Sequence, residues 1–207
     1  MDLLLDPAEV RVLGSLMEKE ATTPEYYPLS LNALCAACNQ KSNRDPVMSL
    51  DTASVEVALD SLCAKGLAYD ISGPALRVHK YSHRIGEVFN FDRREYAVLC
   101  VLMLRGPQTV GELRGRTDRL YTFDDLTTVE ATLNRLAERT PPLVMKLVRQ
   151  PGEKEPRFAH LLSGEPAVAA PQPVRESPPL IEERVIRLEE ELTKLRREFE
   201  DFRRNFE

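Results

Sequence analysis

The sequence contains no hydrophobic run long enough to cross a membrane, although 43% of its 207 residues are hydrophobic. Residues 1–6 also lack the basic segment and the apolar stretch that make up a secretory signal. The four cysteines all lie in apolar helical patterns, which is typical of reduced thiols: Cys35, Cys38, Cys63 and Cys100. We therefore expect a cytoplasmic protein with no membrane contact.

A strong excess of basic residues is also missing. The formal net charge is −5, and the most basic segment, residues 85–162, carries 12 basic against 11 acidic side chains. A dedicated nucleic-acid-binding domain usually concentrates Lys and Arg on one face. Any contact with nucleic acid must therefore come from local clusters of basic residues.

The sequence lacks the motifs of the common catalytic sites. No glycine-rich phosphate loop follows an expected strand, and no Ser/His/Asp, Cys/His or paired-carboxylate arrangement stands out. Cys35 and Cys38 form a Cys-x-x-Cys motif, but zinc would need two further ligands and there is no second such motif. We interpret these thiols as buried structural residues, and we expect neither enzymatic activity nor a metal or other cofactor.

What the sequence does contain is an internal repeat of four blocks in the same order, which predicts that one fold is used twice. The matched blocks are residues 6–17 with 92–103, 28–34 with 107–113, 54–62 with 128–136, and 80–83 with 157–160. His83 and His160 end the last pair of blocks. We interpret these two histidines as a shared feature of the fold rather than as catalytic bases.

Each copy of the repeat predicts three helices followed by a β-hairpin. Asp6 and Asp92 are the expected N-caps of the first helices and Ser30 and Thr109 of the second, with a capping box from Thr109 to Glu112. The expected strands are residues 67–71 and 75–81 in the first copy, and 143–149 and 157–162 in the second. Three helices with a hairpin are typical of a winged helix, in which helices two and three form a helix-turn-helix.

The C-terminal residues follow a heptad pattern. Apolar side chains recur at alternating steps of four and three, which favours a left-handed parallel coiled coil and hence a homodimer. The predicted dimerisation residues are Ile181, Val185, Leu188, Leu192, Leu195, Phe199, Phe202 and Phe206. Alternatively, a single amphipathic helix could fold back on its own domain. A helix on a membrane surface is disfavoured, because residues 180–207 carry more acidic than basic side chains.

Together these patterns predict an α-rich protein of the α+β class. The expected domains are a winged helix at residues 1–84, a second winged helix at 85–162, a proline-rich linker at 163–179 and a coiled-coil helix at 180–207.

Three polar segments, residues 39–46, 104–113 and 152–162, resemble the hallmark segments of the YceH-like family of uncharacterised bacterial proteins. The resemblance covers roughly residues 4–162. It implies a tandem winged-helix fold and a bacterial source, and it implies no known activity.

The predicted nucleic-acid contacts lie mainly in the turns and on the hairpin of the second copy, where Lys and Arg could reach phosphates. They are Lys41, Asn43, Arg44, Arg114, Arg116, Arg119, Asn134, Arg135, Lys154 and Arg157. Glu56 and Asp60, on the third helix of the first copy, would face phosphates unfavourably.

Alternatively, these basic residues form a solvated loop, or pair with nearby carboxylates at Asp118, Asp124 and Asp125. For residues 39–46 two interpretations stay open: a capping and turn segment, or a recognition loop for a phosphate or a partner.

The leading hypothesis is a dimeric, non-enzymatic protein that binds double-stranded DNA, mainly through phosphates, with a role in transcription. Four winged helices in one dimer would add avidity to weak single contacts. The alternative is a protein–protein interaction scaffold, in which the acidic third helix of the first copy meets a basic partner. The sequence names no DNA site, effector or partner.

Overall fold

A computed structural model describes residues 4–71, 78–149 and 152–166, all of which lie in one compact unit, Met1–Pro166. The predicted coiled coil over residues 180–207 and most of the predicted linker lie outside the described residues. Within the described part, no helix is both long and apolar enough to cross a membrane.

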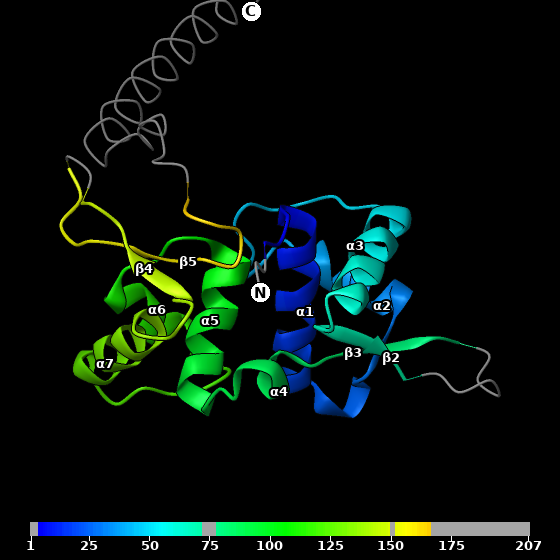
Figure 1. Ribbon diagram of the computed structural model, residues 1–207, viewed down its shortest axis with the longest axis horizontal. Coiled ribbons are helices and arrows are strands. Elements are labelled where there is room, and N and C mark those ends of the chain that lie inside the picture. Colours follow the sequence, from blue (N-terminus) through cyan, green and yellow to red (C-terminus); the bar gives the residue numbers. More distant parts are fainter. Residues whose placement is uncertain (1–3, 72–77, 150–151, 167–207) are drawn as a thin grey trace, which may run out of the picture. The chain divides into compact units, whose positions relative to one another are not determined.

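The N-terminal repeat is built from four helical segments and three short strands (Figure 1). Its three strands form one antiparallel sheet in the order β1-β3-β2. The elements are α1 (Pro7–Thr22), the 3-10 helix η1 (Pro24–Tyr26), β1 (Leu29–Ser30), α2 (Leu31–Cys38), α3 (Thr52–Ala64), β2 (Ala68–Asp70) and β3 (Lys80–His83).

The C-terminal repeat follows after a short connecting helix that the sequence patterns did not predict, α4 (Ile85–Phe89). Its two strands form a second antiparallel ladder. The elements are α5 (Arg93–Arg105), α6 (Val110–Arg116), α7 (Leu126–Ala137), β4 (Val144–Lys146) and β5 (Phe158–His160). All four hairpin strands are shorter than predicted, but the mixture of helices and short strands agrees with an α+β protein.

The predicted helix caps are confirmed. Asp6 forms a capping box with Glu9 at the start of α1, and Asp92 forms the same box with Glu95 at the start of α5. The hydroxyl of Ser30 accepts a hydrogen bond at the start of α2, and Thr109 with Glu112 forms a capping box on α6. The third helices are capped by an aspartate in both repeats, which the sequence patterns did not single out: Asp51 and Asp125.

The two repeats also share their backbone pairing. In each repeat a leucine N–H after the third helix donates back to a leucine carbonyl of that helix, from Leu67 to Leu62 at 2.9 Å and from Leu143 to Leu136 at 3.0 Å. In each ladder a histidine closes the register: Ala68 lies opposite His83, and Val144 lies opposite His160. Matching sequence blocks therefore adopt matching local structure.

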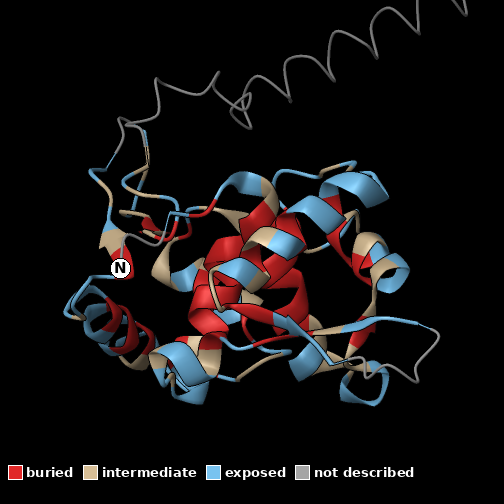
Figure 2. Ribbon diagram, turned by 45° about the vertical axis from the view of Figure 1, so that its right-hand side comes forward, coloured by how far each residue is buried: buried red, intermediate tan, exposed pale blue. Residues whose placement is uncertain are grey.

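α1 and α5, the first helices of the two repeats, pack directly against each other at the centre (Figure 2). Every residue from Glu9 to Glu18 on α1 is buried, because α2 and α3 cover one side of the helix and α5 covers the other. The close approach requires a glycine, since a Cβ at Gly14 would lie 3.0 Å from the Leu104 side chain. One hydrophobic core therefore runs through both repeats.

Candidate functional site

The end of α6 and the turn after it carry three of the six predicted phosphate-binding arginines. α6 begins with its capping box and packs against α7, and Arg114, Arg116 and Arg119 lie on α6 or in the turn after it. The side chains of Arg114 and Arg119 are exposed, and that of Arg116 is half-buried. The structure thus brings these three predicted residues into one region of the C-terminal repeat.

Several of the predicted cations are already bound within the chain. Arg114 donates to the carbonyl oxygens of Phe123 at 3.3 Å and Asp124 at 2.9 Å, so it holds the turn before α7. The exposed guanidinium of Arg135 lies 2.7 Å from a carboxylate oxygen of Asp92. A phosphate would have to compete with these contacts.

Glu112 gathers two more of the predicted cations. It lies 3.4 Å from Arg116 and 2.7 Å from Arg157, which also contacts Glu153 at 3.1 Å. Burial alone would raise the pKa of Glu112, but the Thr109 N–H and the two arginines outweigh burial and lower that pKa. The Glu112 carboxylate is therefore a built-in substitute for an external anion.

Other predicted cations are available to a ligand. Lys41, Arg119 and Lys154 are exposed, and none has a hydrogen-bond or ion-pair partner among the described residues. Asn134 is exposed on α7 and is equally unpartnered there.

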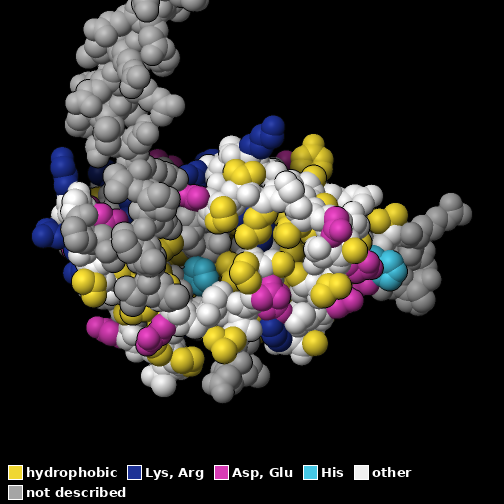
Figure 3. Space-filling view, turned by 90° about the horizontal axis from the view of Figure 1, so that it is seen from above, with side chains coloured by type: hydrophobic (Ala, Val, Ile, Leu, Met, Phe, Trp, Pro, Cys, Tyr) yellow, Lys and Arg dark blue, Asp and Glu magenta, His cyan; other side chains and the backbone are white. Residues whose placement is uncertain are grey.

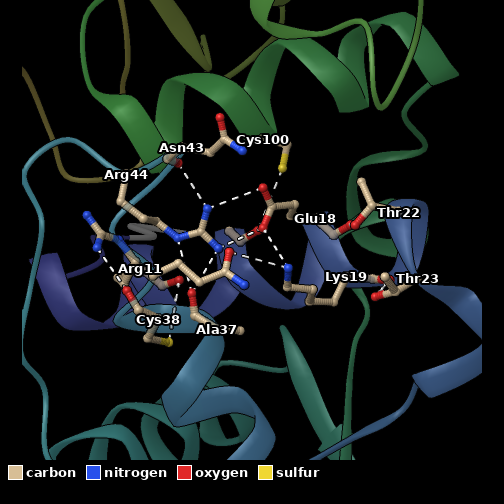
Figure 4. A network of polar contacts seen from close by, with 12 residues as sticks. Arg11, Glu18, Lys19, Thr22, Thr23, Ala37, Cys38, Asn43, Arg44 and Cys100 are labelled. Carbon is tan, nitrogen blue, oxygen red and sulfur yellow. Dashed lines mark hydrogen bonds and ion pairs between the residues drawn. The ribbon is translucent and has the colours of Figure 1, made fainter.

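The prediction that Arg44 contacts phosphate from the protein surface is wrong. Its side chain is 0% exposed and lies between α1 and α2, where it forms two hydrogen bonds with the Glu18 carboxylate, at 3.2 and 2.7 Å (Figure 4). It also donates to the carbonyl oxygen of Ala37 at the end of α2. A buried arginine in such a pair cannot reach a phosphate, so Arg44 belongs to the interior of the fold.

The rest of residues 39–46 is also held by internal contacts. The Asn39 side-chain amide donates to the carbonyl oxygen of Leu50 at 2.7 Å and accepts from the Leu50 N–H at 2.8 Å. Arg11, which is 2% exposed, donates to the carbonyl oxygen of Pro46 at 2.6 Å. The backbone N–H of Asp45 donates to Leu104 on α5 at 2.9 Å. These contacts support the interpretation of the segment as a structural turn.

The third helices of the two repeats present different exposed faces. On α3 the face holds Glu56, Asp60 and Val57, whose side chain is 70% exposed. On α7 the equivalent positions to Val57 and Asp60 are Ala131 and Asn134, so the face has less negative charge. Figure 3 shows a view in which several acidic side chains lie together beside the exposed histidine at the edge of the N-terminal repeat.

Three charged residues with central contacts were missed by sequence reasoning: Arg11, Glu18 and Arg105. They occupy helical positions in which a charge ordinarily faces solvent, so periodicity alone gave no signal. Arg105, at the end of α5, donates to the Asn43 side chain and thereby joins the two repeats. Asn43 has a left-handed backbone with φ of 58°, a conformation that asparagine tolerates better than most residues.

The cysteines and the paired histidines have structural contacts. No disulfide links Cys35, Cys38, Cys63 or Cys100. Burial raises the pKa of the Cys38 thiol to about 11, which makes it a poor nucleophile. His83 bonds the Tyr96 hydroxyl and lies near a Glu20 carboxylate, and so connects β3 with α5 and α1.

Most of this chain is similar in sequence to known proteins. Residues 5–153 match the family described as "Protein of unknown function, DUF480". A UPF0502 protein of Solibacter usitatus is 64% identical over 169 residues, which are 82% of this chain and 81% of that protein. A UPF0502 protein of Geobacter sulfurreducens is 58% identical over 170 residues, 82% of this chain and 77% of that protein. The YceH-like name stays a prediction. The chain belongs to the DUF480/UPF0502 family of uncharacterised bacterial proteins.

Proposed function

We propose that this protein is a non-enzymatic, cytoplasmic DNA-binding protein with two tandem winged helices, which acts as a homodimer through residues 180–207. The observation that carries the proposal is the α6–α7 pair. It has the order of a helix-turn-helix, an exposed polar face on α7 and the unpartnered Arg119 in its turn. The twice-repeated order of three helices and a hairpin supports the winged-helix assignment.

The contacts would be mainly with phosphates. Lys41, Arg119 and Lys154 are exposed and unpartnered, whereas the base-reading face of α7 offers few donors beyond Asn134. Binding of this kind depends on released counterions, so its affinity falls steeply with salt and lies in the micromolar range, about 10⁻⁴–10⁻⁶ M, at physiological salt.

The test is fluorescence anisotropy of a labelled random DNA duplex with the full-length protein at low and moderate salt. Ala131→Glu places a negative charge on the exposed face of α7 and should weaken binding. Val57→Glu makes the matched change on α3 and should leave DNA binding unchanged. The proposal fails if no binding occurs even at low salt, or if the two variants bind equally well.

The homodimer is tested separately by light scattering of the full-length chain and of a truncation before Ser177. We expect the full-length protein to have twice the monomer mass and the truncated protein to be monomeric with weaker DNA binding, because avidity is lost. A monomeric full-length chain would remove dimerisation from the proposal.

A second function, recognition of a basic protein partner, is favoured by one observation. α3 exposes Val57 between two carboxylates, and the neighbouring β2 segment exposes Tyr69 and Ile71. Apolar side chains ringed by charge are typical of protein interfaces. In affinity capture from bacterial lysate, this function predicts that Val57→Glu loses the partner and that Ala131→Glu retains it.

A further inference from the structure

A small pocket lies where the two repeats meet, between α1, α5 and α6. Its cavity volume is about 30 Å³, and its lining includes side chains from α1, from the loop after α2, from α5 and from the end of α6. The polar lining residues are Glu18, Thr22, Asn43, Arg105, Arg116 and Arg119. Three arginines, from α5, α6 and the turn after α6, therefore line one cavity together with one glutamate.

The Glu18 carboxylate is shared with two cations outside this set of three arginines. Glu18 is already held by both nitrogens of the buried Arg44 and lies 3.4 Å from Lys19 (Figure 4). Its charge is therefore shared with Arg44 and Lys19 as well as with the pocket.

The three arginines differ in their partners within the described residues. Arg105 donates to the Asn43 amide oxygen, which carries no charge. Arg116 donates to the Gln108 amide and shares Glu112 with Arg157. Arg119 has no partner among the described residues.

Arg105 and Arg116 lie close enough for their charges to repel each other. Burial lowers the pKa of Arg105, and the nearby charges of Arg116 and Arg44 lower it further, which outweighs the charges of Glu18 and Asp45 that raise it. An anion bound between the guanidinium groups would relieve this repulsion and could accept several charge-assisted hydrogen bonds, which arginine's planar donor fork forms readily with phosphates.

We propose that this junction pocket, lined by Arg105, Arg116 and Arg119, binds a phosphoryl group. The cavity volume of about 30 Å³ is small, so only the head of a ligand enters and the remainder stays outside. The apolar wall from Val101 and Leu104 limits competing water contacts. The phosphoryl group belongs either to a small phosphomonoester or to a nucleic-acid backbone. The site does not depend on the proposed function.

The test is a titration of the full-length protein with inorganic phosphate and with a nucleoside monophosphate, against chloride at equal ionic strength. Binding is read from heat and from the thermal midpoint, because a ligand stabilises the state that binds it. We expect saturable binding, and we expect Arg119→Ala to weaken it by about tenfold, since one charge-assisted hydrogen bond is worth about that much. Because Arg119 is exposed, Arg119→Ala should fold like the unaltered protein, so weaker binding would reflect the lost contact.

The matched control is Arg93→Ala. Arg93 is exposed and unpartnered among the described residues, and it lies at the other end of α5, about 18 Å from Arg105 at roughly 1.5 Å per residue. It should bind phosphate like the unaltered protein. A second variant, Arg105→Gln, should also lose phosphate binding with its circular dichroism spectrum unchanged.

Absence of a phosphate-specific effect, equal binding by Arg119→Ala, or equal loss in Arg93→Ala would overturn the proposal. The source of the phosphoryl group is decided by anisotropy with labelled duplex DNA. If Arg119→Ala weakens both ligands, the group comes from the DNA backbone. If only the monophosphate is affected, the ligand is a small molecule. Phosphate binding without any DNA binding would leave the pocket standing and refute the proposed function.

Discussion

At the scale of single residues, Arg44 and Glu18 form a buried ion pair that links α1 to the loop after α2. The Arg44 guanidinium is fully buried and joins the Glu18 carboxylate of α1 to the carbonyl at the end of α2. Burial alone would raise the pKa of Glu18, but the hydrogen bonds and charge of Arg44 outweigh burial and lower it. The Glu18 carboxylate therefore stays ionised, and loss of Arg44 would leave it buried without its partner.

Arg44→Ala should lower the free energy of unfolding by about 3–5 kcal/mol, because it leaves a buried carboxylate without its partner. Lys41→Ala, in the same loop but exposed and unpartnered, should change stability by less than about 0.5 kcal/mol. Urea unfolding followed by circular dichroism measures both. Equal stability of the two variants would show that the ion pair contributes little.

His160 gives the fold a pH dependence. Burial lowers the pKa of His160 to about 4, and its Nδ1 is buried without a hydrogen-bond partner. Because the folded-state pKa lies below the unfolded value near 6.5, the unfolded chain takes up the proton first as pH falls. This contribution to stability is complete above about pH 6.5 and is lost as the pH falls toward about 4.

Between about pH 6.5 and 5, the free energy of unfolding should therefore fall by roughly 1–2 kcal/mol less in His160→Gln than in the unaltered protein. The carboxylates with lowered pKa values, Glu9, Glu18 and Glu112, lose their contributions only at lower pH. His79→Gln, on the exposed β2–β3 hairpin segment, is the control and should keep the decrease. An unchanged pH profile in His160→Gln would contradict the burial argument.

At the scale of elements, the α1–α5 contact sets the distance between the repeats. A Cβ at Gly14 would lie 3.0 to 3.3 Å from the side chains of Leu104 and Met103, so the two helices touch across a glycine. Gly115, on α6, has no atom within 4 Å of the same position and a helical backbone. A side chain therefore has no room at Gly14 but has open space at Gly115.

Gly14→Val should destabilise the protein by about 1–3 kcal/mol, because the added carbons force the helices apart. Gly115→Ala should stabilise it by about 0.5–1 kcal/mol through the lower entropy of the unfolded chain. Thermal unfolding measures both signs. A neutral Gly14→Val would mean that the helices separate without cost.

At the scale of the whole molecule, the two repeats share contacts that ordinarily lie inside one domain. α1 packs on α5, the Asp45 N–H donates to Leu104, and Arg105 donates to Asn43. The division at residues 84 and 85 stays a prediction, but these contacts imply that the repeats depend on each other for stability.

We expect the repeats to unfold together. The chain has no tryptophan, so Tyr81→Trp and Tyr121→Trp, at partly buried positions in different repeats, give one fluorescent reporter each. Both should report the same urea midpoint, since one core links the repeats. Two separate midpoints would instead show two independently stable domains.

Much of the local structure could be predicted from sequence. The repeat, the caps at Asp6, Asp92, Ser30 and Thr109, and the order of three helices and a hairpin follow from short-range patterns. The candidate site was predicted less well. Lys41, Arg119 and Lys154 are exposed as expected, whereas Arg44 is buried, because a loop arginine looks the same in sequence whether it faces water or a buried glutamate.

The sequence by itself determined the three main helices and the hairpin of each repeat and the caps of the first two helices, since caps and periodicity act within a few residues. Only the tertiary structure decided how the repeats meet and which charges they share. Arg105 lies at the end of α5 and Asn43 lies in a loop 62 positions earlier in the chain, and no local pattern relates them. Long-range packing placed them at one pocket, which three arginines from different parts of the C-terminal repeat line.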